Sequence, residues 1–310
     1  MGVINPYRLK VSQLRALVAI ADAGTFSQAA LELDMSQSSI SHAIATLEDQ
    51  LGVVLLNRGN QGATLTPLGE DITAEARQVL HNLEAITQKA EAARGGTEGQ
   101  VRVASFRSVA THVLPEVIQQ LQSTHPGLQV VLQEHPHFTA VNEAVRQGHA
   151  DVGFTYLPAD KDFESWELLR DRYLVLMPPQ AEPVQPMTWQ DLEQHQLILP
   201  PVVDGCRMLL DRYFKEADHT LNPAYEVKED STALRMVQQG LGVTIMAKMA
   251  AEPILEGIQV ADLAVPLERV IGVIQRTDAL LPPPVYAFMD ALKKVWQQSG
   301  MTLSPVAAQS

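Results

Sequence analysis

Residues 24–48, GTFSQAALELDMSQSSISHAIATLE, predict two short helices joined by a tight turn. Thr25 and Gln28 form a T-x-x-Q pattern that can cap the start of the first helix. Ser36 is suited to cap the second helix, because its hydroxyl can accept a free backbone N–H of the first turn. The apolar residues of the second helix recur at helical spacing and define its buried face: Ile40, Ile44 and Leu47.

The opposite face of the second helix carries polar side chains near its N-terminus, namely Gln37, Ser38, Ser41 and His42. A helix-turn-helix places the start of its second helix in the major groove of DNA. There Gln pairs well with adenine, and Ser can reach several bases. Taken alone, the pattern also fits any amphipathic helical hairpin with a solvated polar face.

The next residues favour the DNA-binding interpretation. Residues 51–66, LGVVLLNRGNQGATLT, predict a strand, a tight Gly-Asn-Gln-Gly turn and a second strand, which is the wing of a winged helix. Thr66 and Pro67 then predict a new helix, with Thr at the cap and Pro at the first helical position.

The ordered run A-x-x-G-T-F-S-x-A-A-x-x-L-x-M-S-Q-S-S-I-S-H-x-I-x-x-L-E-x-x-L-G, continuing to L-x-R and L-T-P-L-G, resembles the N-terminal domain of LysR-type transcriptional regulators. Two positions depart from that pattern. Leu56 stands where the family usually has Phe, and Gln61 stands where a wing Arg is common, which weakens the expectation of a backbone or minor-groove contact there. We expect the following residues to contact DNA: Thr25, Ser27, Ser36, Gln37, Ser38, Ser39, Ser41, His42 and Arg58.

Length and composition set the broad class. The chain has 310 residues, enough for two or three domains with separate cores, and its 46% hydrophobic and 19% charged residues are typical of a globular protein. No apolar run reaches the roughly 20 residues of a membrane span, and no apolar segment of a signal peptide follows Met1. One cysteine excludes an intramolecular disulfide framework. We therefore expect a cytoplasmic protein with no membrane partner.

The formal net charge of −13 opposes DNA binding, because contacts to phosphate usually supply much of the affinity. Residues 1–70 also carry more acidic than basic side chains. A dimeric DNA reader can nevertheless work with few phosphate contacts, backbone amides and helix N-termini. The charge therefore predicts weak non-specific binding and a shallow dependence of affinity on salt.

Residues 67–94 predict a long linker helix. Its apolar residues recur at spacings of three and four that suit pairing with another helix: Ile72, Ala76, Val79, Leu83, Ile86 and Ala90. The alternative is that this stripe packs on its own domain. A position between two domains favours pairing with a second copy, and the resemblance implies a homo-oligomer, dimer or tetramer, formed through this helix.

Beyond residue 99, short apolar runs alternate with helical segments, as in an α/β fold. Gly148-x-Ala-Asp-Val-Gly and Gln239-Gly-x-Gly-Val-x-x-Met resemble the effector-binding region of the same family, which is similar to a periplasmic binding protein with two α/β subdomains around a cleft. The resemblance implies a winged helix-turn-helix over 1–66, a linker helix over 67–94, a first subdomain over 99–168 plus 270–302, and a second over 169–269. We also expect one helix over 109–122 and a frayed tail over 303–310.

In an open α/β sheet, ligands bind beyond the carboxyl ends of the strands, next to helix N-termini. Three segments of the chain occupy such positions and supply candidate effector-binding residues: Ser105, Phe106, Arg107, Ser108, Thr155, Tyr156, Val203, Cys206 and Arg207. Ser hydroxyls, Arg side chains and helix N-termini favour a carboxylate or phosphate, so we predict a small organic anion as effector. Arg107 and Arg207 fit equally well as surface charges or as partners of Asp204.

His135-Pro136-His137 fits a solvated loop better than a metal site, because no cysteine pair or ligand spacing accompanies it. We expect no metal and no cofactor apart from the effector. The sequence also shows no nucleophile elbow and no triad spacing, so we do not expect an enzyme.

The sequence thus predicts a ligand-responsive transcriptional regulator that binds operator DNA, and the resemblance implies RNA polymerase as a further partner. One alternative is a solute-binding receptor of a transport system. Another is a redox-sensing regulator that uses Cys206, and an enzyme with Cys206 as nucleophile comes third. A helix N-terminus and Arg207 would activate the Cys206 thiol, whereas Asp204 and the lack of a second cysteine oppose a redox role.

Overall fold

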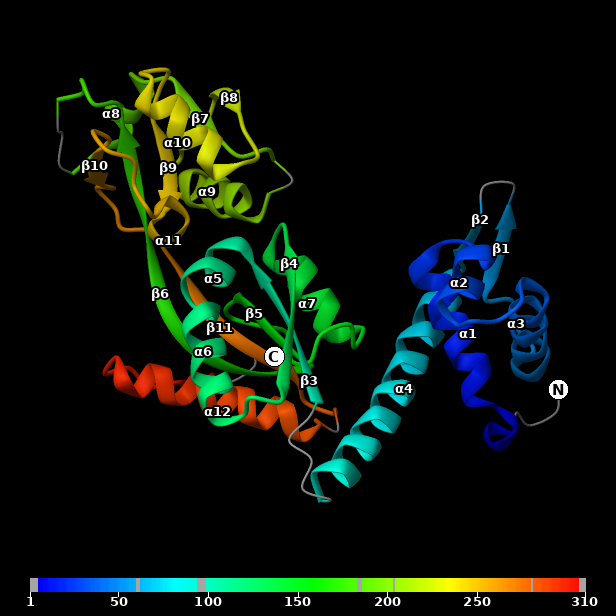
Figure 1. Cartoon of the computed structure of the whole chain (residues 1–310). Helices are drawn as coiled ribbons and strands as arrows, with labels where there is room; N and C mark the ends of the chain where they lie inside the picture. Colours follow the sequence, from blue (N-terminus) through cyan, green and yellow to red (C-terminus); the bar gives the residue numbers. More distant parts are fainter. Residues whose placement is uncertain are drawn as a thin grey trace. The chain divides into compact units, whose positions relative to one another are not determined.

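The structure is a computed structural model, and it describes residues 5–59, 62–93, 99–182, 186–202, 204–279 and 281–306. The chain divides into two compact units, one built mainly before Gln100 and the other mainly from Gln100 onward. Figure 1 draws the first unit in blue and cyan and most of the second in green to red. None of the helices in the described ranges combines the length and the apolar character that a membrane crossing needs.

The first unit begins with a winged helix-turn-helix. Its elements are η1 (Pro6–Arg8), α1 (Val11–Ala23), α2 (Phe26–Glu32), α3 (Gln37–Leu51), β1 (Leu56–Gly59) and β2 (Gly62–Leu65). The α2 helix begins where predicted, since Thr25 Oγ1 accepts the backbone N–H of Gln28 at 3.2 Å. The α3 helix begins after Ser36, whose Oγ accepts the backbone N–H of Ser39 at 3.1 Å. The predicted inner face of α3 is fully buried in the core that α1 shares: Ile40, Ile44 and Leu47.

The wing is an antiparallel pair of strands, with Leu56 opposite Leu65 and Gly59 opposite Gly62. The predicted turn residues Asn60 and Gln61 lie outside the described residues. The predicted winged helix-turn-helix is therefore confirmed: α1, α2 and α3 form its helices, and β1 and β2 form its wing.

The α4 helix (Pro67–Ala93) spans the predicted linker. Thr66 caps it, since Thr66 Oγ1 accepts the backbone N–H of Gly69 at 2.9 Å. A Cβ at position 69 would lie 2.1 Å from the carbonyl oxygen of Leu55, so this close approach of the helix to the wing requires glycine.

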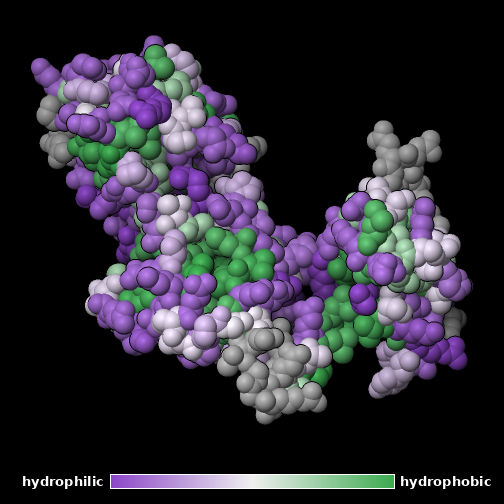
Figure 2. Space-filling model, viewed as in Figure 1, coloured by the Kyte–Doolittle hydropathy of each residue, from purple (hydrophilic) through white to green (hydrophobic). Residues whose placement is uncertain are grey.

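The apolar stripe of α4 serves two different purposes. Ile72 and Ala76 pack into the core of the winged helix, and Ala76 is only 2% exposed. Val79, Leu83 and Ile86 are 42%, 38% and 58% exposed, and Figure 2 shows an apolar patch along this helix. The prediction of one continuous dimer seam is therefore wrong for Ile72 and Ala76, because these two residues complete the core of their own domain.

The second unit contains a mixed sheet of eight described strands, with neighbours in the order β10-β6-β11-β5-β3-β4 and with β9 and β12 also paired to β6. These strands are β3 (Gly99–Phe106), β4 (Leu128–His135), β5 (Val152–Tyr156), β6 (Phe163–Met177), β9 (Thr244–Ala247), β10 (Gln259–Asp262), β11 (Glu268–Arg276) and β12 (Ser304–Val306). A separate parallel pair consists of β7 (Leu197–Leu199) and β8 (Pro223–Glu226). The helices are α5 (Arg107–His112), α6 (Leu114–Thr124), α7 (Phe138–Arg146), α8 (Trp189–Glu193), α9 (Gly205–Glu216), α10 (Asp230–Gln238), α11 (Lys248–Ala251) and α12 (Pro283–Gln298).

Two long strands, β6 and β11, connect the two lobes of this unit (Figure 1). The first part of β6, up to Arg172, pairs with β11, and the part from Tyr173 to Met177 pairs with β9 and β10. The first lobe holds β3 to β5, α5 to α7 and α12, and the second lobe holds β7 to β10 and α8 to α11. The predicted subdomain boundaries at 169 and 270 fall inside β6 and β11, so the lobes share strands at their junction. The predicted α/β fold with two lobes is confirmed.

Two expectations fail in the first lobe. The helix expected over 109–122 is interrupted, because α5 ends and α6 begins on either side of Val113. Pro115 explains the break, since it has no backbone N–H and its ring obstructs the preceding turn of a continuous helix. The tail is not frayed at Ser304–Val306, which pairs with β6 as β12.

Candidate functional site

The start of α3 presents a polar surface on the winged helix. Gln37, Ser38, Ser39 and His42 are exposed, and Ser41 is half-buried. The Oγ atom of Ser36 lies 2.9 Å from Ser38 Oγ and 2.7 Å from Ser39 Oγ, so these three hydroxyls form one cluster at the capped helix end. The α3 helix therefore carries its candidate base-reading side chains on the side opposite to its buried face.

The remaining candidate DNA contacts flank α3. Thr25 is half-buried and caps α2, and Ser27 is exposed on the same helix. The backbone of Arg58 lies in β1 opposite Ala63, while its side chain lies outside the described residues.

In the second unit, a cavity of about 260 Å³ lies between the two lobes, with walls from both. Five of the nine residues that the sequence predicts for the effector line this cavity: Phe106, Arg107, Ser108, Tyr156 and Cys206. The sequence thus locates the cavity correctly at the end of β3, the end of β5 and the start of α9.

Three other predicted residues do not line the cavity. Ser105 and Thr155 are completely buried, and their hydroxyls form no hydrogen bond within the described part of the chain. Arg207 is 5% exposed and points into the second lobe, where Nε bonds to Asp211 Oδ1 at 2.8 Å and Nη1 bonds to the Pro200 carbonyl oxygen at 3.1 Å. The suggested pairing of Arg207 with Asp204 is therefore wrong.

The ninth candidate, Val203, lies outside the described residues.

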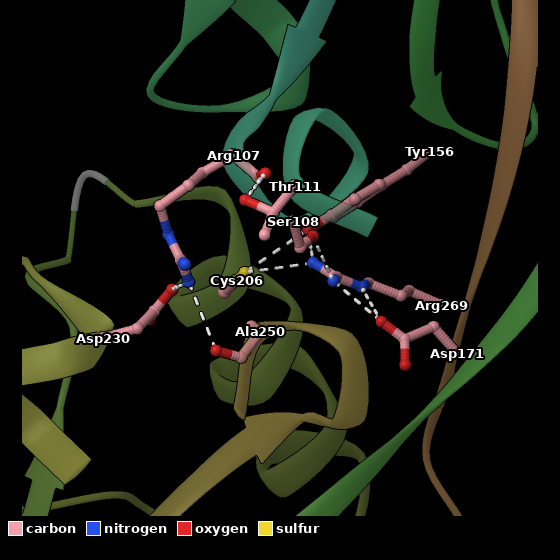
Figure 3. Close-up of polar contacts among 9 residues, drawn as sticks. All are labelled: Arg107, Ser108, Thr111, Tyr156, Asp171, Cys206, Asp230, Ala250 and Arg269. Atoms are coloured by element: carbon pink, nitrogen blue, oxygen red, sulfur yellow. Dashed lines mark hydrogen bonds and ion pairs between the residues drawn. The ribbon is translucent and has the colours of Figure 1, made fainter. Parts of the chain in front are cut away.

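Arg269 lines the cavity and is 3% exposed, and Figure 3 shows its polar contacts. Its Nε and Nη2 atoms lie 2.9 and 2.7 Å from Asp171 Oδ2, and Nη2 also donates to Ser108 Oγ at 2.9 Å. Nη1 donates to the hydroxyl of Tyr156 at 2.5 Å and to Cys206 Sγ at 3.7 Å. These contacts account for all five N–H donors of the guanidinium, so Arg269 ties the two lobes together and has no free donor for a ligand.

Arg107 lines the same cavity and is arranged differently. Its Nη2 atom forms an ion pair with the carboxylate of Asp230 and a 3.2 Å hydrogen bond with the carbonyl oxygen of Ala250 (Figure 3). The Arg107 side chain is 43% exposed, and among the described residues its Nε and Nη1 atoms form no hydrogen bond. Burial raises the pKa of Asp230, although the attraction of Arg107 opposes this shift.

Cys206 faces the same cavity from the first turn of α9. Asp204 caps this helix, since Asp204 Oδ1 accepts the backbone N–H of Cys206 at 2.8 Å. The thiol lies 3.3 Å from the hydroxyl of Tyr156, and burial raises its pKa although Arg269 attracts the thiolate. The carboxylate of Asp204 therefore already occupies the N-terminus of α9. Because its pKa is raised, the Cys206 thiol is protonated at neutral pH.

The histidine segment also lines the cavity, which contradicts its interpretation as a solvated loop. His135 ends β4 and is only partly exposed, and its Nε2 atom is buried without a hydrogen bond in the described part of the chain. Burial and the nearby His137 lower the pKa of His135, so it is neutral near pH 7. In the described ranges, no three His, Cys, Asp or Glu side chains are arranged to hold a metal ion.

Several residues of this site were not predicted from the sequence. Asp230, Lys228 and Glu229 enter the cavity from the start of α10, and Phe138 enters it from the start of α7. Both segments follow a strand and open a helix, so the rule that located Ser108 could have found them. Arg269 comes from the beginning of a strand, a place to which that rule does not point.

A winged helix-turn-helix, a long helix and a two-lobed α/β unit with a polar cavity define a class of protein that joins a DNA reader to a ligand sensor. The family model "LysR substrate binding domain" matches residues 94–297, and "Bacterial regulatory helix-turn-helix protein, lysR family" matches residues 11–70. The chain is 42% identical over 288 residues to a probable HTH-type transcriptional regulator, LrrA, of Synechococcus elongatus, which covers 92% of this chain and 97% of that protein.

Two solved structures show the same fold. A variant of full-length OxyR from Pseudomonas aeruginosa matches with a TM-score of 0.72 and 24% identity over 92% of this chain and 97% of that one. Full-length CbnR complexed with its target DNA matches with a TM-score of 0.54 and 24% identity over 92% of this chain and 99% of that one.

The chain belongs to the LysR family of transcriptional regulators. The predicted function is therefore confirmed at the level of a ligand-responsive, DNA-binding regulator, and the prediction that the chain is not an enzyme agrees with the regulatory role of its relatives.

Proposed function

We propose that this regulator reads operator DNA with the first turn of α3, assembles through the exposed part of α4, and responds to a small organic anion that binds at Arg107. The observation that carries the effector part is the guanidinium of Arg107, which is 43% exposed at the wall of a cavity between two lobes. RNA polymerase and a cytoplasmic location belong to the same proposal, because they follow from a role in transcription.

The DNA-reading part rests on the polar surface of α3. Gln37 and His42 are exposed at its start, where a helix-turn-helix meets base edges. The similar fold of CbnR, which is complexed with its target DNA, supports an operator as the partner. Arg58 on the wing should contact phosphate, so Arg58→Ala should weaken binding to all DNA sequences alike and flatten the salt dependence.

The assembly part rests on three exposed apolar side chains. Val79, Leu83 and Ile86 follow one another at spacings of four and three, so they share one side of α4. Exposed apolar residues at helical spacing suit a seam with the same helix of a second copy, and we propose a dimer that associates further into a tetramer.

Two other functions are less well supported. A solute-binding receptor of a transport system would not need the winged helix-turn-helix, which the chain shares with DNA-binding regulators. Redox sensing through Cys206 would need a reactive thiolate, whereas burial raises the pKa of this thiol and the chain has one cysteine in total.

A thermal-shift screen of small organic anions tests the effector part, because a ligand that binds only the folded state raises the melting temperature. We expect at least one anion to raise the melting temperature of the wild type and to lose this effect in Arg107→Gln. Lys215→Gln, which removes a cation from the far end of α9, serves as the matched control and should keep the effect. An anion that stabilises the wild type and Arg107→Gln equally would contradict binding at Arg107.

A further inference from the structure

A carboxylate of the chain itself occupies the position at which an anionic effector would bind. We propose that Asp230 is an internal competitor for Arg107, and that the effector is a molecule with a single carboxylate, which displaces Asp230 when it binds. This inference rests on the proposed function of the cleft and adds to it the charge of the ligand and the residue that opposes its binding.

The available donors point to Arg107 as the receptor of that carboxylate. Arg269 uses all five of its N–H donors within the protein, and Arg207 points away from the cavity. Lys228 lines the cavity but is exposed at its rim, where solvent weakens an ion pair. Among these cations, Arg107 alone lines the wall with N–H groups, on Nε and Nη1, that form no hydrogen bond in the described part of the chain. A carboxylate held by two donors of a guanidinium uses Nη2 together with Nε or Nη1, and Nη2 is the atom that Asp230 contacts.

The other charges of the cavity limit the ligand to one anionic group. Glu134, Asp204 and Glu229 line the wall together with Asp230, and Asp204 already occupies the N-terminus of α9. A polyanion would approach these carboxylates closely, which costs free energy because like charges repel at short range. Three aromatic rings offer an apolar surface to the rest of the ligand: Phe106, Phe138 and Tyr156.

The Arg107–Asp230 ion pair also joins the two lobes. Arg107 begins α5 of the first lobe, whereas Asp230 begins α10 and Ala250 lies in α11, both in the second lobe. A ligand carboxylate at Arg107 therefore replaces a direct bond between the lobes by one that runs through the ligand. With this exchange, the binding free energy of the ligand depends on how the two lobes are arranged. A ligand that binds one arrangement more tightly shifts the protein toward it, which is what a regulatory response requires.

The displaced carboxylate can take up a proton. Burial and the neighbouring Asp204 raise the pKa of Asp230, and Arg107 and Arg269 oppose this. When the ligand takes Arg107, Asp230 loses that attraction and gains a second carboxylate nearby, so its pKa rises further. The other titratable groups that line the same cavity are Glu134, His135, His137, Tyr156, Cys206, Lys228 and Glu229.

The test measures the affinity of two simple probes, acetate and phenylacetate, for four forms of the full chain by calorimetry and thermal shift at constant ionic strength. The forms are wild type, Asp230→Asn, Glu229→Gln and the double variant Arg107→Gln/Asp230→Asn. Glu229→Gln is the matched control, because it removes one negative charge from the same wall but leaves Arg107 paired. Phenylacetamide, which has no charge, controls for binding through the ring alone.

We expect Asp230→Asn to bind at least one of the two carboxylates about tenfold more tightly than the wild type, because Arg107 is no longer occupied in most molecules. Glu229→Gln should stay within about twofold of the wild type, and the double variant should lose the gain. The inference is overturned if Asp230→Asn gains for neither probe, if Glu229→Gln gains equally, or if the double variant keeps the gain. The thermal shift of the wild type against Arg107→Gln tests anion binding at Arg107 by itself. A failure of the proposed effector site is therefore distinguished from a failure of this inference, which concerns Asp230.

Discussion

Replacing Asp171 by Asn should destabilise the second unit by about 3–5 kcal/mol, the usual cost of removing one partner of a buried ion pair. Asp171 and Arg269 are each 3% exposed, and Asp171 Oδ2 accepts from both Nε and Nη2 of Arg269. The amide of Asn can still accept one hydrogen bond, but the guanidinium then stays buried without a counter-charge. Asp171 Oδ1 also accepts the backbone N–H of Met249 at 3.1 Å, so the substitution perturbs α11 as well.

Tryptophan fluorescence reports this unfolding selectively, because all three tryptophans, Trp166, Trp189 and Trp296, lie in the second unit. At roughly 2–4 °C per kcal/mol for a unit of this size, Asp171→Asn should lower the melting temperature by about 6–20 °C. Glu167→Gln serves as the control, because it removes an acidic side chain from the same strand. The ion-pair partner of Glu167 is Arg170, which is 58% exposed, so this variant should cost less than about 1 kcal/mol.

A loss below about 1 kcal/mol in Asp171→Asn would refute the argument that the buried pair holds the lobes together. The double variant Asp171→Leu/Arg269→Met gives a second check, because it removes both charges. It should recover much of the stability, and additive losses in the double variant would contradict a direct interaction between the two side chains.

Further predictions concern the DNA surface, the seam and the cavity. Gln37→Ala should cost about 1–3 kcal/mol on cognate DNA in a gel shift, whereas equal losses on random DNA would show that Gln37 reads no base. Leu83→Asp should abolish the dimer by placing a charge in the seam, and an unchanged mass in light scattering would exclude that seam. Cys206→Ser should keep DNA binding, and peroxide should not change DNA binding by the wild type. A peroxide-dependent gel shift that disappears in the variant would instead support redox sensing through Cys206. Phenylacetate affinity of the wild type should rise as pH falls, because binding takes up a proton at Asp230, whose pKa is already raised. Asp230→Asn should show a weaker pH dependence, left to the other titratable groups of the cavity, and the same pH dependence in both proteins would contradict this coupling.

The first unit was predictable from the sequence because its signals are local. Thr25, Ser36 and Thr66 each cap a helix within three residues, and the structure shows all three caps. The division of the α4 stripe was not predictable, because whether Ile72 and Ala76 pack on their own domain depends on where α1 lies in space.

The cavity was only partly predictable. Adjacent residues of a strand face opposite sides, and the sequence does not show which side of β3 faces the cavity. It could therefore not distinguish the buried Ser105 from its neighbour Phe106, which lines the cavity. Arg107 and Asp230 are separated by 123 residues, and a single sequence carries no signal for such a pairing. Arg207 is the opposite case, since its spacing of four from Asp211 on α9 already indicated an ion pair on the helix itself.

Fluorescence anisotropy with labelled DNA from upstream of the protein's own gene tests whether this chain is a sequence-specific, ligand-responsive regulator. We expect saturable binding by the wild type that is at least about 10³-fold tighter than binding to a scrambled sequence at the same salt concentration. We also expect the affinity to change when an anion that stabilises the wild type, but not Arg107→Gln, is added. Equal affinity for both DNA sequences would contradict the claim that this chain is a sequence-specific regulator.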